Sequence, residues 1–184
     1  PLVMLMVYGF VFALVLRARW PGLTDEQGPL AYSALLLSGL MIHGFLAECL
    51  TRAPGQIVAN ANFVKKVVFP LPVIAISQWL AAVFHLGINL IVLLVFQIAV
   101  FGVPPITAIL APLSLLPLLA IGLGLMWGLS ALAVYFRDLT HIVGVVATLL
   151  LFLSPALYPL EQVPEGLRSF IYLNPLTFAL EHWR

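Results

Sequence analysis

Long runs of apolar residues, separated by short polar and charged segments, are the main feature of the chain. Charged residues divide it into five such runs, which cover residues 1–16, 30–50, 70–101, 106–135 and 142–160. A helix needs about 20 apolar residues to cross the roughly 30 Å hydrocarbon core of a bilayer. The pattern predicts an all-α membrane protein, a polytopic bundle with about five transmembrane helices, the first of which is short for a span.

The third and fourth runs are unusually long. Each has about 30 residues and would reach about 45 Å as one helix, so these helices must tilt or project beyond the hydrocarbon. The uncharged segment that joins them contains Gly102, Pro104 and Pro105. Glycine and proline interrupt helices, so we predict a tight helical hairpin at this point.

The chain changes character after residue 160. Two apolar pieces of about eight residues follow, and Asn174 and Pro175 separate them. Neither piece is long enough to cross a bilayer, and a proline disfavours helix at the residue before it. We predict two short helices that lie at the outer interface or are re-entrant.

The composition supports a membrane protein. Of the 184 residues, 63% are hydrophobic and only 8% are charged, whereas a soluble domain has about 25% charged residues. The net charge of +1 gives no indication of a nucleic-acid partner. The single cysteine, Cys49, excludes an intramolecular disulfide. We predict one membrane domain over residues 1–184 and no soluble domain.

Basic residues predict an orientation in the membrane. The loop after the second run has Arg52, Lys65 and Lys66 but no acidic residue, and the loop after the fourth run has Arg137 beside Asp138. With these two loops inside, four of the eight basic residues lie on each side, so the count alone does not decide. We place both loops in the cytoplasm because the outer basic residues are mixed with acidic ones.

Common motifs for catalysis and nucleotide binding are missing from the sequence. Neither lysine follows a glycine, as it does in the phosphate-binding loop of ATPases. No histidine or cysteine pair has the spacing of a zinc site, and we find no nucleophile paired with a base. We expect a chain that is not an enzyme and that holds no cofactor of its own.

Two ionisable residues lie in the second run. Glu48 is four residues before Arg52, a spacing that permits an ion pair near the inner interface. We favour this pair over a functional intramembrane carboxylate. His43 is five residues before Glu48 and lies on a different part of the helix surface. Here we favour a packed interior histidine over a proton relay.

Polar residues of the third run share one helix face. Gln78, His85 and Asn89 recur at spacings of seven and four. Hydrogen bonds to neighbouring helices are the role we favour for them. A polar stripe along a substrate path is the alternative.

The fourth run contains Gly124 and Gly128, a Gly-x-x-x-Gly pair, with Gly122 and Ser130 nearby. Small residues permit close helix packing, either within one subunit or between two.

Aromatic residues gather near the predicted outer interface. They form either a belt that anchors helices at the level of the lipid headgroups or a stacking surface for sugar rings. The residues are Phe152, Tyr158, Phe170, Tyr172, Phe178 and Trp183.

The basic loop, residues 51–69, is too long for a tight turn and is amphipathic over residues 56–68. It is either a solvated loop that meets anionic lipid or a short helix that docks on a cytoplasmic partner.

Five short motifs follow one another along the chain. They begin at Asn60 (NANFVKKVVFPLP), Tyr135 (YFRDLTH), Ser154 (SPALYP), Val163 (VPE) and Leu173 (LNPLT). Each motif alone is weak, but the ordered set covers nearly the whole chain and resembles the ABC-2 type permeases that export polysaccharides, including O-antigen, capsule and teichoic acid.

This resemblance implies a multi-pass subunit of a bacterial cytoplasmic (inner) membrane with six spans. It also implies a second copy of the permease, two copies of a cytoplasmic subunit that binds ATP and Mg²⁺, and a lipid-linked glycan as substrate. Compared with that pattern, the chain lacks an N-terminal interface helix and a sixth span, so we expect it to be truncated at both ends.

The resemblance also implies roles for particular residues. The basic loop becomes a coupling helix that contacts the ATPase, and the turn after the fourth run helps to transmit helix motion, with a plain interfacial turn as the alternative. The coupling candidates are Asn60, Asn62, Lys65, Lys66, Arg137 and Asp138. The candidates for a substrate path are Gln78, His85, Asn89, Phe152, Tyr158 and Tyr172.

The function predicted from these features is the permease subunit of an ATP-driven exporter of a lipid-linked polysaccharide. An ABC-2 type drug or lipid exporter has the same fold and is the first alternative. A membrane-embedded glycosyl or acyl transferase would need clustered Asp, Glu or His at one interface, and the sequence has only scattered ones. A structural or assembly protein is the last alternative.

Overall fold

The computed structural model describes residues 3, 6–7, 10–11, 28–60, 70, 72–102, 106–158, 163–172 and 174–183. Over these residues the secondary structure is helical, with no strand. The helices are α2 (Gly28–Arg52), α3 (Gln56–Ala59), α5 (Pro72–Phe101), the 3₁₀ helix η2 (Ile106–Leu115), α6 (Leu116–Tyr135), α7 (Leu139–Phe152), α8 (Glu165–Tyr172) and α9 (Pro175–Trp183).

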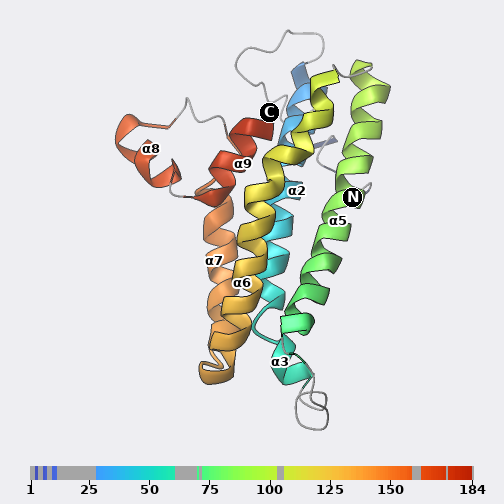
Figure 1. Cartoon of the computed structure of the whole chain (residues 1–184). Coiled ribbons are helices and arrows are strands. Elements are labelled where there is room, and N and C mark those ends of the chain that lie inside the picture. The colour runs from blue at the N-terminus through green and yellow to red at the C-terminus, as the bar shows by residue number, and fades with distance from the viewer. Residues whose placement is uncertain are drawn as a thin grey trace.

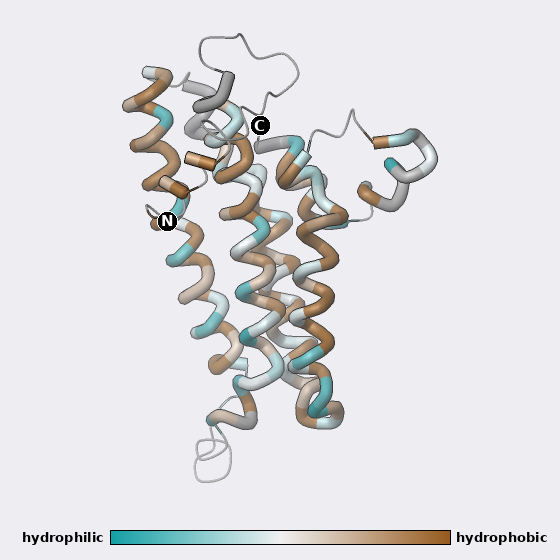
Figure 2. Tube along the Cα trace, turned by 180° about the vertical axis from the view of Figure 1, so that it is seen from behind, coloured by the Kyte–Doolittle hydropathy of each residue, from teal (hydrophilic) through white to brown (hydrophobic). Residues whose placement is uncertain are grey.

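The long helices α2, α5, α6 and α7 run side by side and form an elongated bundle (Figure 1). The short helix α3 and the turn between α6 and α7 lie at one end, which we call the α3 end. The helices α8 and α9 lie toward the other end, which we call the α9 end. Seen from behind, α5 and α7 are hydrophobic over most of their length, with separate polar positions along α5 (Figure 2).

Helix α2 forms the centre of the bundle. It packs against α5, α6 and α7. Of an apolar 18-residue stretch in each helix, 56% is buried in α2, compared with 11% in α5. Its buried side chains Ile42, Phe45, Leu46 and Cys49 belong to the largest core cluster among the described residues. The other helices therefore expose apolar surface on the outside, as expected where lipid or another subunit replaces water.

Three helices among the described residues are long and apolar enough to cross a membrane: Ala31–Arg52, Pro72–Phe101 and Ala111–Tyr135. They confirm the second, third and fourth predicted spans. The first predicted span, residues 1–16, falls mainly outside the described residues.

The fourth run is not one continuous α-helix, contrary to the prediction. It begins as the 3₁₀ helix η2, which contains Pro112, and becomes α-helical at Leu116. Pro112 and Pro117 lack the N–H that an α-helix interior requires. Pro112 lies inside the 10-residue 3₁₀ segment. Pro117 lies in the first turn of α6, where proline is accepted.

The fifth predicted span is shorter than expected. Instead of continuing from residue 142 to residue 160, α7 ends at Phe152 and has 14 residues, or about 21 Å. A turn follows at residues 153–158. Pro155 explains the ending, because its ring would clash with the carbonyl of the preceding turn if the helix continued. The prediction of a full-length fifth span was wrong for this reason.

Helix α5 ends at Phe101, directly before Gly102, as predicted from the sequence. Gly102 has a positive φ of 85°, and its N–H donates to the Ile98 carbonyl at 3.1 Å. Glycine is the residue that adopts this left-handed conformation without strain at a helix end. The rest of the predicted hairpin, residues 103–105, lies outside the described residues.

Two short helices, α8 and α9, are present in the C-terminal part of the chain, as predicted, and their place relative to the membrane stays a prediction. They have 8 and 9 residues and are separated at Asn174, as the Asn-Pro pair indicated. The structure adds that α9 packs on η2, α2 and α6 and that Leu176, Thr177 and Leu180 are fully buried. Helix α9 is therefore part of the bundle core.

Candidate functional site

The coupling candidates that the structure describes lie at the α3 end (Figure 1). Asn60 is half-buried and follows α3, where its Nδ2 donates to the Gln56 carbonyl at 2.9 Å. Asn62, Lys65 and Lys66 lie outside the described residues, so their predicted role stays a prediction.

Arg137 and Asp138 form an exposed turn between α6 and α7 at the same end. Asp138 is the N-cap of α7, but its carboxylate makes no capping hydrogen bond. Within the described part of the chain, neither side chain takes part in an ion pair. Both are therefore accessible to a partner that approaches the α3 end.

The turn between α2 and α3 is anchored in the bundle, which the sequence did not indicate. The Ala53 carbonyl accepts a hydrogen bond from Ser130 Oγ on α6 at 3.0 Å. Gln56 Nε2 donates to Met126 Sδ on α6 at 2.9 Å. Gln56 is only 5% exposed, although an amphipathic loop would be expected to keep it in water. The start of the basic loop is therefore attached to α6.

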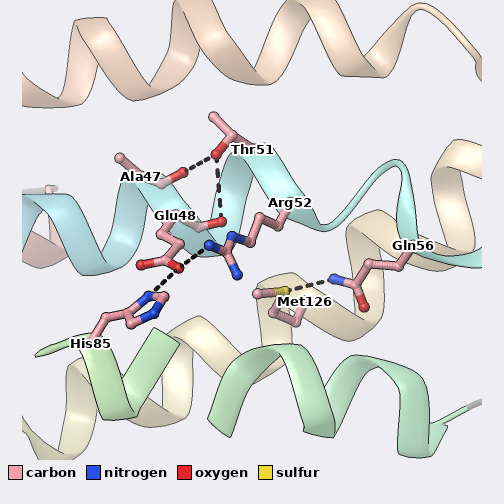
Figure 3. A network of polar contacts seen from close by, with 7 residues as sticks. All are labelled: Ala47, Glu48, Thr51, Arg52, Gln56, His85 and Met126. Carbon is pink, nitrogen blue, oxygen red and sulfur yellow. Dashed lines mark hydrogen bonds and ion pairs between the residues drawn. The ribbon is translucent and has the colours of Figure 1, made fainter. Parts of the chain in front are cut away.

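A cluster of charged side chains joins α2 to α5 (Figure 3). Arg52 Nη2 and His85 Nδ1 each lie 2.8 Å from the same carboxylate oxygen, Glu48 Oε1. Because a carboxylate only accepts hydrogen bonds, the His85 ring must carry a proton on Nδ1 for this contact. The Glu48–Arg52 pair was predicted from its spacing, whereas the participation of His85 needed the helix arrangement.

Glu48 is the best-shielded member of this cluster. Its side chain is 19% exposed, compared with 42% for Arg52 and 47% for His85. The carboxylate thus lies between the helices, while the two basic groups reach the outer surface of the subunit. A charged group in a membrane helix is expensive unless it is paired or reaches water, and here the three groups satisfy one another.

Gln78 and Asn89 remain on the same flank of α5 as His85, as their spacing predicted. Both are half-buried, and neither side chain forms a hydrogen bond to another described residue. Of the three, only His85 makes the interhelical contact that we favoured. Gln78 and Asn89 are thus the members with free hydrogen-bonding groups within the described part of the subunit.

His43 connects α2 to α7. Its Nε2 lies 2.9 Å from the Ala147 carbonyl, so the ring donates from Nε2, because a carbonyl can only accept. The residue is half-buried in the packed interface. This is the interior packing role that we favoured for His43.

The end of α7 is capped by side chains from both sides of the following turn. The last four carbonyl groups of an α-helix have no partner within the helix, and in a membrane water is not available to replace one. All four carbonyls, from Leu149 to Phe152, accept hydrogen bonds. The donors are, in order, the Leu153 N–H, Asn174 Nδ2, Ser154 with both its N–H and its hydroxyl, and the Tyr158 hydroxyl.

Asn174 is a central member of this cap. Its Nδ2 donates to the Leu150 carbonyl at 3.0 Å, and its Oδ1 accepts from the Leu176 N–H at 3.0 Å. It therefore caps the end of α7 and the beginning of α9 at the same time. The Ser-Pro and Asn-Pro motifs of the sequence are explained by this arrangement.

Helix α2 packs against the turn that follows α7. A Cβ placed on Gly39 would lie 3.0 Å from the backbone of Ala156, so a larger residue would require that backbone to shift by a few tenths of an ångström. The Tyr32 hydroxyl lies 3.5 Å from the Leu157 carbonyl. The turn after α7 is thus packed directly on the central helix.

The aromatic path candidates differ in their surroundings. Phe152 and Tyr172 are exposed, whereas Tyr158 is half-buried and donates to the Phe152 carbonyl at 2.8 Å. Burial raises the pKa of Tyr158. The structure brings Phe152 and Tyr158 together.

The polar and aromatic path candidates do not lie together within one subunit. Gln78, His85 and Asn89 are on α5, and Phe152 ends α7; these two helices lie on different sides of α2 (Figure 1). No group of three or more His, Cys, Asp or Glu suited to a metal ion is found among the described residues.

The glycines of α6 face in two directions. A Cβ on Gly122 would lie 2.8 Å from the Phe45 ring and 3.2 Å from Cys49 Sγ, so Gly122 packs within the subunit. Gly124 and Gly128 are exposed, with nothing within 4 Å of a Cβ. The Gly-x-x-x-Gly pair therefore does not pack inside the described part of this subunit.

Comparison with known proteins decides what kind of membrane bundle this is. The sequence profile of the ABC-2 type transporter family matches residues 1–184, the whole chain. The chain belongs to the ABC-2 type transporter family. An ABC-2 type transporter pairs its membrane part with an ATP-binding subunit, and this chain is a multi-pass membrane part.

Relatives with assigned names agree. The chain is 32% identical over 189 residues to the "O-antigen export system permease protein RfbA" of Klebsiella pneumoniae, covering 100% of this ABC-2 chain and 68% of the relative. It is 29% identical to the protein of the same name from Myxococcus xanthus, with 100% and 68% covered. It is 23% identical to the "Polysialic acid transport protein KpsM" of Escherichia coli over 83% of this chain and 59% of the relative.

Proposed function

We propose that this chain is the permease of an ATP-driven exporter that moves a lipid-linked polysaccharide across the cytoplasmic membrane of a bacterium. The observation that carries the proposal is the similarity along the whole chain to permeases named for O-antigen export. A relative named for polysialic acid transport points to the same substrate class. The proposal names the class of polymer and leaves its sugars open.

The proposed assembly contains two copies of the permease and two copies of a cytoplasmic ATP-binding subunit, which holds ATP and Mg²⁺. The accessible Arg137–Asp138 turn and Asn60 lie at the same end of the bundle, which supports a docking role for that end. Asn62, Lys65 and Lys66 would extend this contact. ATP binding acts on the permease only if the partner contacts its two conformations differently.

We propose a passage for the glycan at the interface of the two permease copies, lined by the flank of α5 and by the aromatic residues at the α9 end. Gln78 and Asn89 offer sugar hydroxyls amide groups that form no hydrogen bond to another described residue, and Phe152 and Tyr172 offer exposed rings. Such contacts are individually weak. Weak, repeated contacts suit a polymer that must move on, because tight binding at any point would stop transport.

A reconstituted transporter tests the proposal. The permease and its ATP-binding subunit would be placed in proteoliposomes with a radiolabelled lipid-linked glycan, and protection of the glycan from an external glycosidase would be followed. We expect protection to change with ATP and to stay constant when the ATP-binding subunit carries an inactive nucleotide site. ATP-dependent movement of a small drug or a plain lipid, with no movement of the glycan, would establish the alternative exporter instead.

A further inference from the structure

The turn between α2 and α3, which we define as residues 53–56 so that it includes Gln56, the first residue of α3, lies against α6. Its two anchors, the Ser130–Ala53 and Gln56–Met126 hydrogen bonds, both end on α6. Met126 and Ser130 are four residues apart, so they are neighbours on one face of that helix, and both are buried. Both hydrogen bonds of the turn therefore end on a single stripe of α6 (Figure 3 shows the contact between Gln56 and Met126).

Both anchors are of a kind that releases easily. Gln56 Nε2 donates to a thioether sulfur, which is a weak acceptor. The other amide atom, Gln56 Oε1, is buried without any hydrogen-bond partner among the described residues. A buried amide with only one of its two polar atoms hydrogen-bonded is unusual and requires an explanation. The Gln56 side chain therefore gains little hydrogen-bond energy from its buried position.

Ser130 has a similar property. Its one hydroxyl proton has two acceptors within reach, the Ala53 carbonyl on the turn and the Met126 carbonyl on its own helix. If the turn moved away, the hydroxyl would keep the second acceptor. Separation of the turn from α6 would therefore leave no buried donor unpaired on α6.

The position of the turn in the chain gives this attachment a direction. The turn is followed by α3 and Asn60, which begin the loop proposed to contact the ATP-binding subunit. From the turn, α6 runs toward η2, and both η2 and α6 pack on α9. Helix α6 thus connects the turn with the α9 end, which lies along the proposed passage for the glycan.

We infer that residues 53–56 form a releasable latch that holds α6 to the ATPase-contacting loop in the resting position and frees it when the loop is displaced, with Gln56 and Ser130 as its positioning residues. This inference rests on the proposed function, because it needs an ATP-binding subunit that moves the loop. It assigns α6 as the helix that responds first. The weak anchors hold the resting position and let go when the loop is displaced.

The first test measures coupling in the complete transporter. Gln56→Met removes both amide atoms at similar volume, and Ser130→Ala removes the hydroxyl. We expect each variant to raise the ATP consumed per glycan exported by about threefold or more, with unchanged abundance in the membrane. Threefold corresponds to loss of about 0.6 kcal/mol, near the lower end of the range for one hydrogen bond. Unchanged coupling, or a parallel loss of export and ATP hydrolysis, overturns the inference.

Matched controls come from α5. Ser77→Ala removes a hydroxyl that bonds only to its own helix, at the Ile74 carbonyl. Gln97→Met repeats the amide replacement at an exposed position. Both controls should keep the wild-type coupling ratio. If the wild-type complex itself shows no ATP-dependent export of glycan, the proposed function fails, and that outcome is separate from any result with the latch variants.

The second test locks the latch. Cys49 is the only cysteine of the chain, so Cys49→Ala gives a background in which Gln56→Cys and Met126→Cys can be joined by a short bis-methanethiosulfonate linker. We expect the linked protein to lose export and to recover it on reduction, while binding of the ATP-binding subunit persists. Export that continues with the link in place, or failure of the two cysteines to react with one linker, overturns the latch.

Discussion

His85 Nδ1 on α5 lies 2.8 Å from Glu48 Oε1 on α2, and Arg52 Nη2 lies 2.8 Å from the same oxygen. One carboxylate thus holds a basic group of its own helix and one of a neighbouring helix (Figure 3). The arrangement joins the most buried long helix to the least buried one. Its loss should therefore loosen the contact between α2 and α5 without affecting the rest of the core.

Replacement of Glu48 tests this relationship. Glu48→Gln should lower the free energy of unfolding by roughly 1–3 kcal/mol, less than the 3–5 kcal/mol of a fully buried pair, because Arg52 and His85 are 42% and 47% exposed. Unfolding in detergent followed by circular dichroism gives the value. Glu181→Gln, an exposed carboxylate on α9, is the control, and an equal effect at both sites would contradict a special role for Glu48.

His43→Leu should weaken the contact between α2 and α7. The variant loses the hydrogen bond to the Ala147 carbonyl, which leaves a carbonyl already bonded within its helix, so we expect a loss of about 1 kcal/mol. His43→Gln keeps an amide donor and should recover part of it. Thermal unfolding of the three proteins in the same detergent is the measurement. Identical stability of the Leu and Gln variants would show that the donor is unimportant.

Gly122→Ala should be destabilising. Its Cβ would meet the Phe45 ring at 2.8 Å and Cys49 Sγ at 3.2 Å, and inserting a methyl group into a packed core costs roughly 1–3 kcal/mol. Gly128→Ala is the matched control on the same helix, because nothing lies within 4 Å of its Cβ. The unfolding midpoint of the isolated permease in detergent should fall for the first variant only. A fall of equal size in both would contradict packing on α2 as the cause, because alanine is the better helix former at either position.

Asn174 should be the most sensitive position of the cap at the end of α7. Asn174→Ala removes a bond to the Leu150 carbonyl and the N-cap of α9, so we expect a loss of about 2 kcal/mol. Asn174→Ser keeps a capping oxygen for the Leu176 N–H but cannot reach Leu150, and should lose about half as much. Protease sensitivity of the α9 end in proteoliposomes, together with thermal unfolding, tests the order of the variants.

Tyr158 distinguishes capping from contact with the glycan. Tyr158→Phe loses the hydroxyl that donates to the Phe152 carbonyl but keeps the ring. If the ring stacks on sugars, Tyr158→Phe should export normally after a small loss of stability of about 1 kcal/mol. Tyr158→Ala and Phe152→Ala should export less at unchanged abundance. Normal export by both alanine variants would return these residues to an anchoring belt.

Local features of the fold were predictable from the sequence because they depend on neighbours in the chain. The long apolar runs predicted the three membrane-length helices of the described residues. Gly102 predicted the end of α5, and the four-residue spacing of Glu48 and Arg52 predicted their ion pair. The split at Asn174 and the two short helices after it were predicted in the same way. The apolar run around Pro155 did not predict the length of α7, because the proline ends the helix inside that run.

The arrangement of the helices was decided only by the tertiary structure. In a soluble helix the apolar face shows which side is buried, but a membrane helix has apolar surroundings on every side, so its composition does not reveal its neighbours. For this reason the sequence could not show that α2 lies at the centre, that His85 meets Glu48, or that Gln56 is buried against α6. These contacts join residues 37 and 70 positions apart, and they exist only once the helices have packed.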